Sequence, residues 1–236
     1  IHIFTDGRDV NPTSGIKYIE ALEKKIKLLG VGQIASISGR YYGMDRDNRF
    51  DRVEKSYLVM TKKSEVKEVK KVWQDSQKEG ITDEFIIPTA TCENAIITDN
   101  DGIIFFNFRP DRLRELASIF TNDDYKCFDR QKINNLKVVT MMPVTDTVLC
   151  PSAFQLQKLD NTLGKYIADL GYSQLRIAET EKYAHVTYFF DGGEDIIFEN
   201  EKRILVPSPK VATYDQEPEM SANMITASLV QEITTN

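Results

Sequence analysis

The sequence predicts an α/β protein, and three observations support this class. A strand, a helix and a second strand follow one another within about the first 40 residues, which is a βαβ unit. Predicted strands and helices then alternate to the end of the chain. A hydrophobic fraction of 41% and a charged fraction of 28% are ordinary for a globular protein, and 236 residues suffice for one large domain or two small ones.

The first βαβ unit begins with strand Ile1–Phe4. Apolar residues recur at helical spacing over Ile16–Leu29, the preceding Thr-Ser pair can cap this helix, and Gly30 ends it. Strand Gln33–Ser38 follows. Two strands joined through a helix favour parallel pairing, so we expect a parallel sheet here.

A hairpin is predicted further along the chain. The residues Asp99–Gly102 read DNDG, a strong turn signal, and they separate the apolar segments Ala95–Thr98 and Ile103–Phe108. The remaining predicted elements of this part are helices Phe50–Met60, Glu65–Lys78 and Asp111–Phe120 and strand Val138–Met142.

A domain boundary is predicted around Pro143–Ser152, where two prolines occur and charges are few. It divides the chain into domains of residues 1–150 and 151–236. The second domain is predicted to contain helix Phe154–Leu170, strand Gln174–Ala178, helix Tyr183–Phe190, strand Arg203–Val206 and helix Ser221–Thr234.

The composition argues against several classes of partner. A net charge of −6 and a pI of about 5.1 provide no overall field for nucleic acid or anionic lipid. No apolar run approaches the roughly 20 residues that span a bilayer. Three widely separated cysteines suit a reducing cytoplasm. We therefore expect a cytoplasmic protein with no nucleic-acid partner and no membrane partner. We also expect a monomer that acts on a small-molecule substrate.

The arginines are unevenly distributed, since eight of the eleven fall in three short stretches. TDGRD, SGRYY and FRPDR each follow a predicted strand. Ligands of open parallel sheets bind beyond the carboxyl ends of the strands. If these three strands are parallel neighbours, Arg8, Arg40 and Arg109 converge on one crevice, where guanidinium groups can hold a carboxylate or a phosphate through paired hydrogen bonds.

Two residues beside these arginines have both a functional and a structural interpretation. Arg112 lies in the first turn of a helix, where a cation is disfavoured unless an anion completes the site. The alternative is a surface ion pair with Asp111 or Glu115. Asp9 could accept a proton from a substrate hydroxyl, or it could be a structural ion pair that orients Arg8.

Other polar residues give weaker signals. Lys182 follows a strand and opens a helix, where an ammonium group can meet a phosphate, although an ordinary surface lysine is the more common case. The carboxylates Glu115, Asp123, Asp124 and Asp129 have no metal-loop spacing and are interpreted as surface residues.

Long stretches of the chain resemble the cofactor-independent phosphoglycerate mutases of the alkaline phosphatase superfamily. They are HIFTDGRDVNPTSG, ISGRYYGMDRDNRFDRVEK, FFNFRPDRLREL, LRIAETEKYAHVTYFFDGG and VPSPKVATYDQEPEMSA. The resemblance implies interconversion of 3-phosphoglycerate and 2-phosphoglycerate in glycolysis through a phosphoserine. It implies two divalent metal ions, typically manganese, and no requirement for 2,3-bisphosphoglycerate. It also implies a phosphotransferase domain followed by part of an alkaline-phosphatase-like α/β domain.

The resemblance assigns roles to individual residues. Asp9 is the candidate proton acceptor, whereas Arg49 and Arg52 are interpreted as helix-surface or supporting residues. The residues that the resemblance places in substrate contact are Arg8, Asp9, Arg40, Arg46, Arg109, Arg112 and Lys182.

The family's serine nucleophile and metal ligands match no residue of this sequence, so the chain resembles an internal fragment of a longer enzyme. We expect it to bind no catalytic metal and to have no mutase activity alone. One alternative is a non-catalytic module that binds a phosphorylated acid. Another is a different mutase of the superfamily, such as a phosphopentomutase, which the GRYY and FRPDR stretches oppose.

Overall fold

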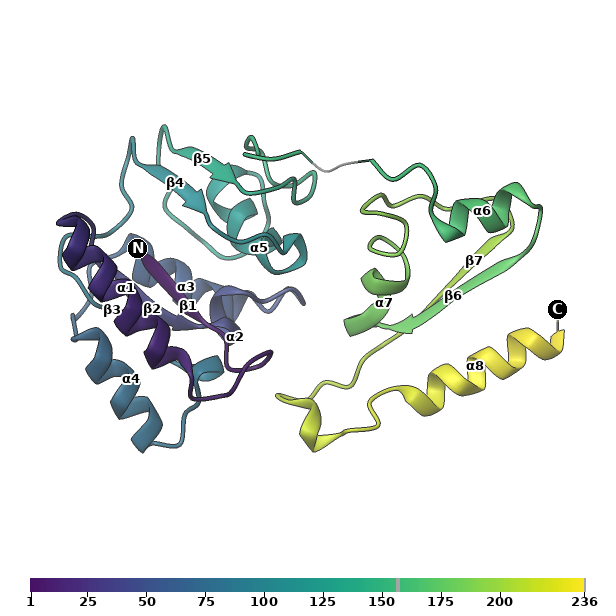
Figure 1. Cartoon of the computed structure of the whole chain (residues 1–236), viewed down its shortest axis with the longest axis horizontal. Helices are drawn as coiled ribbons and strands as arrows, with labels where there is room; N and C mark the ends of the chain where they lie inside the picture. Colours follow the sequence, from purple (N-terminus) through teal and green to yellow (C-terminus); the bar gives the residue numbers. More distant parts are fainter. Residues whose placement is uncertain (156–157, 236) are drawn as a thin grey trace. The chain divides into compact units, whose positions relative to one another are not determined.

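The structure is a computed structural model that describes residues 1–155 and 158–235. It divides into two compact units, Ile1–Gln155 and Leu156–Asn236 (Figure 1). Both units combine helices with pairs of parallel strands. The α/β class predicted from the sequence is therefore confirmed.

The first unit contains the following elements: β1 (His2–Thr5), α1 (Gly15–Leu29), β2 (Ser36–Gly39), α2 (Arg40–Gly43), α3 (Phe50–Thr61), α4 (Val69–Lys78), the 3-10 helix η1 (Asp83–Phe85), β3 (Thr89–Ala90), β4 (Gly102–Phe105), α5 (Pro110–Thr121) and β5 (Lys137–Thr140).

The main sheet of this unit has the order β1-β2-β3, and the predicted parallel pairing of β1 with β2 is confirmed. Helices cover both faces of this sheet, because neighbouring residues of a strand point to opposite sides. Ile3 packs into a core formed with α1 and α4, whereas Phe4 packs into a second core formed with α3 and α5. The turns after β1 and β2 therefore emerge from a sheet that is fixed on both faces.

The predicted hairpin is wrong. A turn does form, since the amide of Thr98 donates to Oδ2 of Asp101, but residues 95–98 form no strand. The amide of Ile97 instead donates to the carbonyl of Met60, and β4 pairs in parallel with β5 in a separate two-stranded sheet. A turn signal indicates that the chain reverses, but not which segment the following strand joins.

Helices α3 and α5 agree with their predicted extents to within one residue. Helix α4 begins at Val69 rather than at Glu65, because Val66 bridges to Ala90 beside the sheet. The carboxylate of Glu68 then accepts hydrogen bonds from the first two lysine amides of α4. This side-chain cap marks the true start of the helix.

The second unit contains the following elements: α6 (Leu163–Asp169), β6 (Gln174–Glu179), α7 (Thr180–Val186), β7 (Glu201–Val206), the 3-10 helix η2 (Tyr214–Gln216) and α8 (Ala222–Thr235). Strands β6 and β7 pair in parallel along their whole length. The buried side chain of Ser221 donates to the carbonyl of Pro207, and its amide donates to Oε2 of Glu179. These bonds fix the start of α8 to the ends of both strands.

Two helix predictions in this unit differ from the structure. The predicted helix Phe154–Leu170 is helical only over Leu163–Asp169, and its residues 156–157 lie outside the described residues. The Oγ1 of Thr162 accepts from the amide of Lys165 and caps this shorter helix. The helix predicted over Tyr183–Phe190 begins at Thr180, directly after β6, and ends at Val186.

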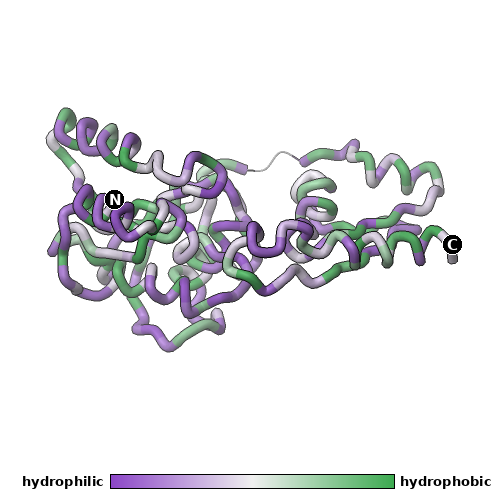
Figure 2. Tube along the Cα trace, turned by 90° about the horizontal axis from the view of Figure 1, so that it is seen from below, coloured by the Kyte–Doolittle hydropathy of each residue, from purple (hydrophilic) through white to green (hydrophobic). Residues whose placement is uncertain are grey.

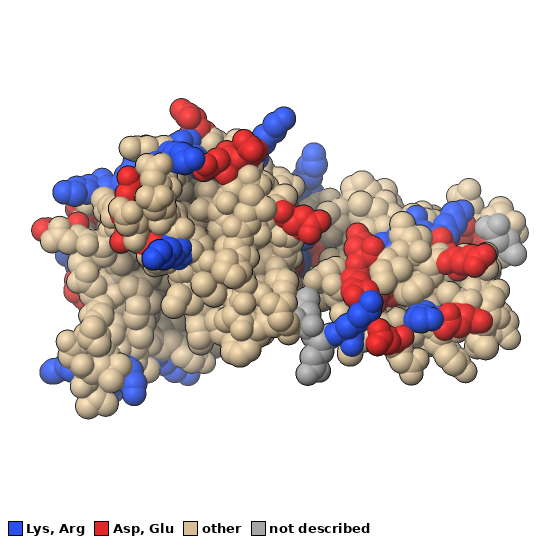
Figure 3. Space-filling view, turned by 90° about the horizontal axis from the view of Figure 1, so that it is seen from above, with Lys and Arg blue, Asp and Glu red and all other residues tan. Residues whose placement is uncertain are grey.

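The surfaces of the two units have mixed character. Figure 3 shows acidic and basic side chains interspersed on each unit rather than gathered into a basic field. Hydrophobic residues continue along α8 (Figure 2), and its Met224, Val230 and Ile233 are exposed. Across the described part of the chain, no helix is both long and apolar enough to cross a membrane.

Candidate anion-binding site

The turns that follow β1 and β2 both lie against η1. A Cβ atom at Gly39 would lie 2.1 Å from the Glu84 carbonyl oxygen, so only glycine fits there. Gly7 has a φ of +68°, and a Cβ atom on it would lie 2.6 Å from the amide nitrogen of Glu84. The amide of Gly39 also donates to the carbonyl of Ile86 at 2.7 Å. This close backbone contact holds both arginine-bearing turns in place.

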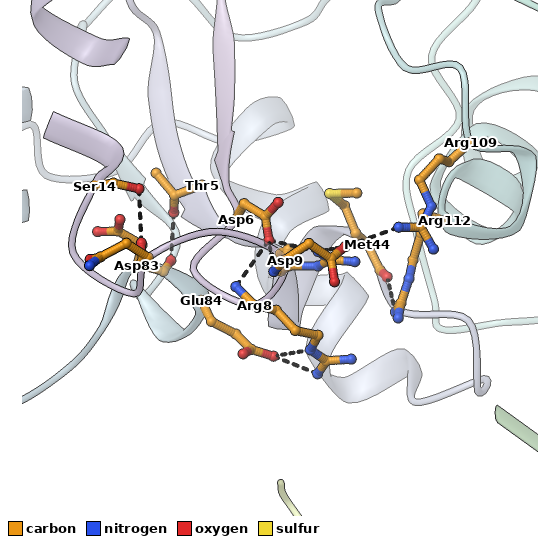
Figure 4. Close-up of polar contacts among 12 residues, drawn as sticks. Thr5, Asp6, Arg8, Asp9, Ser14, Met44, Asp83, Glu84, Arg109 and Arg112 are labelled. Carbon is orange, nitrogen blue, oxygen red and sulfur yellow. Dashed lines mark hydrogen bonds and ion pairs between the residues drawn. The ribbon is translucent and has the colours of Figure 1, made fainter. Parts of the chain in front are cut away.

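Arg8 leaves the first of these turns and pairs with Glu84 (Figure 4). Its Nε donates to Oε1 of Glu84 at 2.7 Å, and Nη2 lies 2.5 Å from the same oxygen. The turn itself is closed by Asp6, whose Oδ1 accepts from the amides of Arg8 and Asp9 at 3.0 Å each. Sequence reasoning placed Arg8 in the site but missed Glu84, which lies 76 positions away in the chain.

Arg40 is buried, with only 3% of its surface exposed. Its Nη1 donates to Oδ1 of Asp6 at 2.7 Å and to Oδ2 of Asp9 at 2.8 Å. The Nε and Nη2 groups of Arg40 are buried without a hydrogen-bond partner. A buried donor without a partner costs about 1–3 kcal/mol, so these two groups of Arg40 lower the stability of the folded chain.

Arg109 lies between Asp9 and Asp111 and contacts both. It lies between β4 and α5, and its Nη1 donates to the same Oδ2 of Asp9 at 3.0 Å. Its Nη2 is 3.5 Å from Oδ2 of Asp111. We expected Arg109 to converge with Arg8 and Arg40 because three strands were parallel neighbours in one sheet, and that topology is wrong. The loop after β4 brings Arg109 to Asp9 instead.

Asp111 binds a second group of arginines. It lies in the first turn of α5, where the helix dipole favours a carboxylate, and only 6% of it is exposed. Its Oδ2 accepts from Nη1 of Arg46 at 2.7 Å and lies 3.9 Å from Nε of Arg112. Arg112 also donates from Nη1 to the Met44 carbonyl at 3.1 Å (Figure 4). The ion pair with Asp111 considered for Arg112 is therefore present, but its expected place on a solvated surface is wrong, since both residues are buried.

Asp9 and Asp111 are both ionised at neutral pH. The hydrogen bond from Arg40 holds the pKa of Asp9 below its usual range. Burial alone would raise the pKa of Asp111, but the hydrogen bond from Arg46 and the charge of Arg109 keep it low. Arginines from three stretches of the chain thus meet the carboxylates of Asp6, Asp9, Glu84 and Asp111. Such a cluster suits an anionic ligand.

Arg52 has a supporting position. Its guanidinium lies 3.7 Å from the centre of the Tyr41 ring, and Nη1 is 3.7 Å from Oδ1 of Asp45. Both contacts fix the segment that carries Arg40 and Arg46.

Lys182 lies in the second unit and is exposed on α7. It follows β6 and opens a helix, which is the local placement that the sequence indicated. Its contact with a phosphorylated ligand stays a prediction.

Glu115 is not a surface residue, contrary to the prediction. Only 1% of it is exposed, and its Oε1 accepts from the amide of Asn48 at 2.9 Å. Burial raises the pKa of Glu115 to about 7, against the effect of the Asn48 hydrogen bond, and nearby Asp45 and Asp47 raise it further. The exposed carboxylates Asp123, Asp124 and Asp129 do agree with the prediction.

We expect Glu115→Gln to stabilise the first unit at about pH 8 and to have little effect below about pH 4. The folded chain keeps the Glu115 proton up to about pH 7, whereas the unfolded chain loses it near 4.5, so stability falls as the pH rises between these values. The difference at pH 8 is at most about 3 kcal/mol. Urea unfolding of both chains across this pH range measures it, and parallel curves would contradict the prediction.

A family model described as the BPG-independent PGAM N-terminus matches residues 1–146, which include every arginine of this network. The chain belongs to this phosphoglycerate mutase family.

Two comparisons with individual members agree with this family. The chain is 50% identical, over an alignment of 243 positions, to the 2,3-bisphosphoglycerate-independent phosphoglycerate mutase of Lachnoclostridium phytofermentans, covering 99% of this chain and 47% of that protein. Its fold matches the crystal structure of Leishmania mexicana phosphoglycerate mutase with a TM-score of 0.86 and 26% identity, covering 100% of this chain and 46% of the other. The chain thus spans about half the length of the mutases it matches.

The resemblance implies divalent metal ions, and the described part of the chain has no cluster of side chains that fits them. Residues 1–155 and 158–235 contain no group of three or more histidine, cysteine, aspartate or glutamate side chains that could hold a metal ion. The carboxylates of the candidate site are paired with guanidinium groups instead.

Proposed function

We propose that this chain supplies the substrate-binding arginines of a cofactor-independent phosphoglycerate mutase, which interconverts 3-phosphoglycerate and 2-phosphoglycerate as an isomerase of glycolysis. The observation that carries the proposal is the convergence of four arginines, from residues 40–46 and 109–112, on Asp9 and Asp111. The family's fold and the names of both relatives support it. The relative's name also supports independence from 2,3-bisphosphoglycerate.

The anionic groups of the ligand would replace protein carboxylates as partners of the guanidinium groups. Phosphoglycerate carries a carboxylate and a phosphate, and each can accept two parallel hydrogen bonds from the N–H edge of a guanidinium group. Arg109 is the most accessible arginine of the network, with 38% of its side chain exposed, so a substrate anion can reach it directly. In this proposal the substrate is also bound by Arg8, Arg40, Arg46 and Arg112. Lys182 would contact its phosphoryl group.

Asp9 is proposed as the proton acceptor for a substrate hydroxyl. Half of its side chain is exposed, at 52%, so a substrate can approach it. Its low pKa makes it a weak base while Arg40 and Arg109 both bind it. A substrate anion that draws these arginines away would raise the pKa of Asp9 and strengthen it as a base.

We predict that the chain binds 3-phosphoglycerate and that Arg109→Ala weakens this binding about tenfold or more, since a charge-assisted pair is lost. Arg114→Ala is the matched control, because Arg114 is an exposed residue on the neighbouring helix α5. Isothermal titration calorimetry measures both affinities. Equal affinities for the two variants, or no binding by the wild-type chain, would remove the basis of the proposal.

We further predict that the chain alone does not turn over 3-phosphoglycerate when manganese is supplied. The residues that the resemblance assigns to the nucleophile and metals have no match in this sequence, and a binding site without a nucleophile transfers no phosphoryl group. A coupled assay for 2-phosphoglycerate measures this. Turnover above the background of an Arg109→Ala control would contradict the prediction.

The proposal includes a division of labour along the chain. Residues 1–150 would belong to the phosphotransferase domain that grips the substrate, and residues 151–236 to the phosphatase-like domain. The extent of the family match, 1–146, and the division into units near residue 155 support this division. We also propose that the protein acts in the cytoplasm as a monomer, without a nucleic-acid or membrane partner.

A further inference from the structure

A loop of six residues, Met44–Arg49, presents Arg46 to the site and is built around a carboxylate. The Oδ2 of Asp45 accepts from the amides of Asp47 and Arg49 at 2.9 and 3.0 Å. Asn48 has a φ of +59°, in the left-handed region that asparagine tolerates better than most residues other than glycine. The loop therefore has a tight turn that internal hydrogen bonds hold in shape.

Glu115 attaches this loop to α5. Its Oε1 accepts from the amide of Asn48 at 2.9 Å, whereas its Oε2 is buried without a hydrogen-bond partner. The carboxyl group of Asp45, itself buried, lies within hydrogen-bonding reach of Glu115. Two adjacent buried carboxyl groups repel each other when both are charged, and a proton on Oε2 would turn that repulsion into a hydrogen bond to Asp45.

We propose that Glu115 is a positioning residue which, as a buried carboxylic acid hydrogen-bonded to Asp45, holds the Met44–Arg49 loop so that Arg46 reaches Asp111 and the substrate. The inference rests on the proposed function, because Arg46 matters to the substrate only there. Loss of the proton to solvent leaves two charged carboxyl groups in contact and loosens the loop. Arg46 then loses its fixed position.

The charged and titratable groups around Glu115 determine whether its pKa is raised or lowered. Asp45 and Asp47 face it from the loop, and Tyr125 faces it from the segment after α5. From α3, Arg52 reaches Asp45 at 3.7 Å and partly compensates its charge. The raised pKa of Glu115, near 7, agrees with a proton that is present below neutrality and lost above it.

The decisive measurement is an NMR titration of the chain that follows the amides of Asp47, Asn48 and Arg49. In the wild type we expect these signals to shift together with a midpoint near about pH 7. Glu115→Gln keeps the hydrogen bonds but cannot lose a proton, so its signals should not shift in this range. Asp45→Asn removes the neighbouring negative charge and should move the midpoint to lower pH. Identical titrations of the wild type and Glu115→Gln would overturn the proposal.

The second measurement connects the loop to the ligand. The affinity for 3-phosphoglycerate is measured at about pH 6 and about pH 8.5, and the wild type is compared with Glu115→Gln at each pH, because the phosphate itself titrates. We expect equal affinities at the lower pH and about fivefold weaker binding by the wild type at the higher pH, as one charge-assisted bond is lost. Glu93→Gln, at an exposed position, is the charge-matched control and should follow the wild type.

The two measurements separate the two proposals. If the wild type binds no 3-phosphoglycerate at any pH, the proposed function fails, and the amide titration still decides the role of Glu115. If the chain binds 3-phosphoglycerate and the ratio of the two affinities does not change with pH, the function stands and the positioning role is overturned.

Discussion

The Asp111→Ala variant is expected to lose about 3–5 kcal/mol of unfolding free energy, because it removes one partner of a buried ion pair. Arg46 would lose its hydrogen bond at 2.7 Å, and Arg109 and Arg112 would lose the nearby negative charge. The guanidinium groups of Arg46 and Arg112 are largely buried, so water cannot fully replace the carboxylate.

Urea unfolding measures this loss in the first unit specifically. Trp73 is the only tryptophan of the sequence and lies in α4, so its fluorescence reports on that unit. Asp51→Ala is the control, because Asp51 also lies in the first turn of a helix, α3, but is exposed. We expect it to cost at most about 1 kcal/mol. Equal losses for the two variants would show that Asp111 contributes only a helix-end effect.

The Asp83→Ala variant is expected to lose about 3 kcal/mol of unfolding free energy, since it leaves two partly buried donors without an acceptor. Asp83 is fully buried, and its Oδ2 accepts from the amide of Gly15, the first residue of α1, at 2.6 Å. Its Oδ1 accepts from Nε1 of Trp73 at 2.6 Å. The carboxylate thus connects the start of α1 to α4 and places η1, which carries Glu84 beside Arg8.

Circular dichroism should follow this variant, because the substitution changes the surroundings of Trp73 directly. Asp83→Asn is the conservative variant, which keeps one acceptor and should recover part of the loss. Asp75→Ala, at a largely exposed position on α4, is the control for removal of an acidic side chain. Unfolding of Asp83→Ala at the same urea concentration as this control would contradict the assigned role.

The sequence predicts the parts of the fold that depend on local pattern. The apolar spacing of α3 and α5 gives their ends to within a residue, and the parallel pair of β1 and β2 follows from the βαβ unit. Most arginines of the candidate site are also visible locally, because Arg8, Arg40, Arg109 and Arg112 follow a strand or open a helix, whereas Arg46 is assigned only through the resemblance. Their types and positions carry the signal for an anion, without any knowledge of the tertiary structure.

The remaining features depend on contacts between distant segments. The true partner of β4 is β5, more than thirty positions on, and no turn signal identifies it. Glu115 looks like a solvated helix residue, and only the fold shows that it is buried against the Asn48 amide. Glu84 and Asp83 have no local pattern that links them to the site, since their partners lie in the turn after β1 and at the start of α1.

The ion pairs that Asp9 and Asp111 make with Arg109 set an upper limit on how tightly any ligand can be held. An incoming acid must compete for the Arg109 guanidinium with carboxylates that belong to the protein. The same internal competitors return to the guanidinium groups when the acid departs. Under the proposed function, a site of this kind favours rapid release over tight retention, which suits a reversible reaction whose substrate and product are isomers with the same charges.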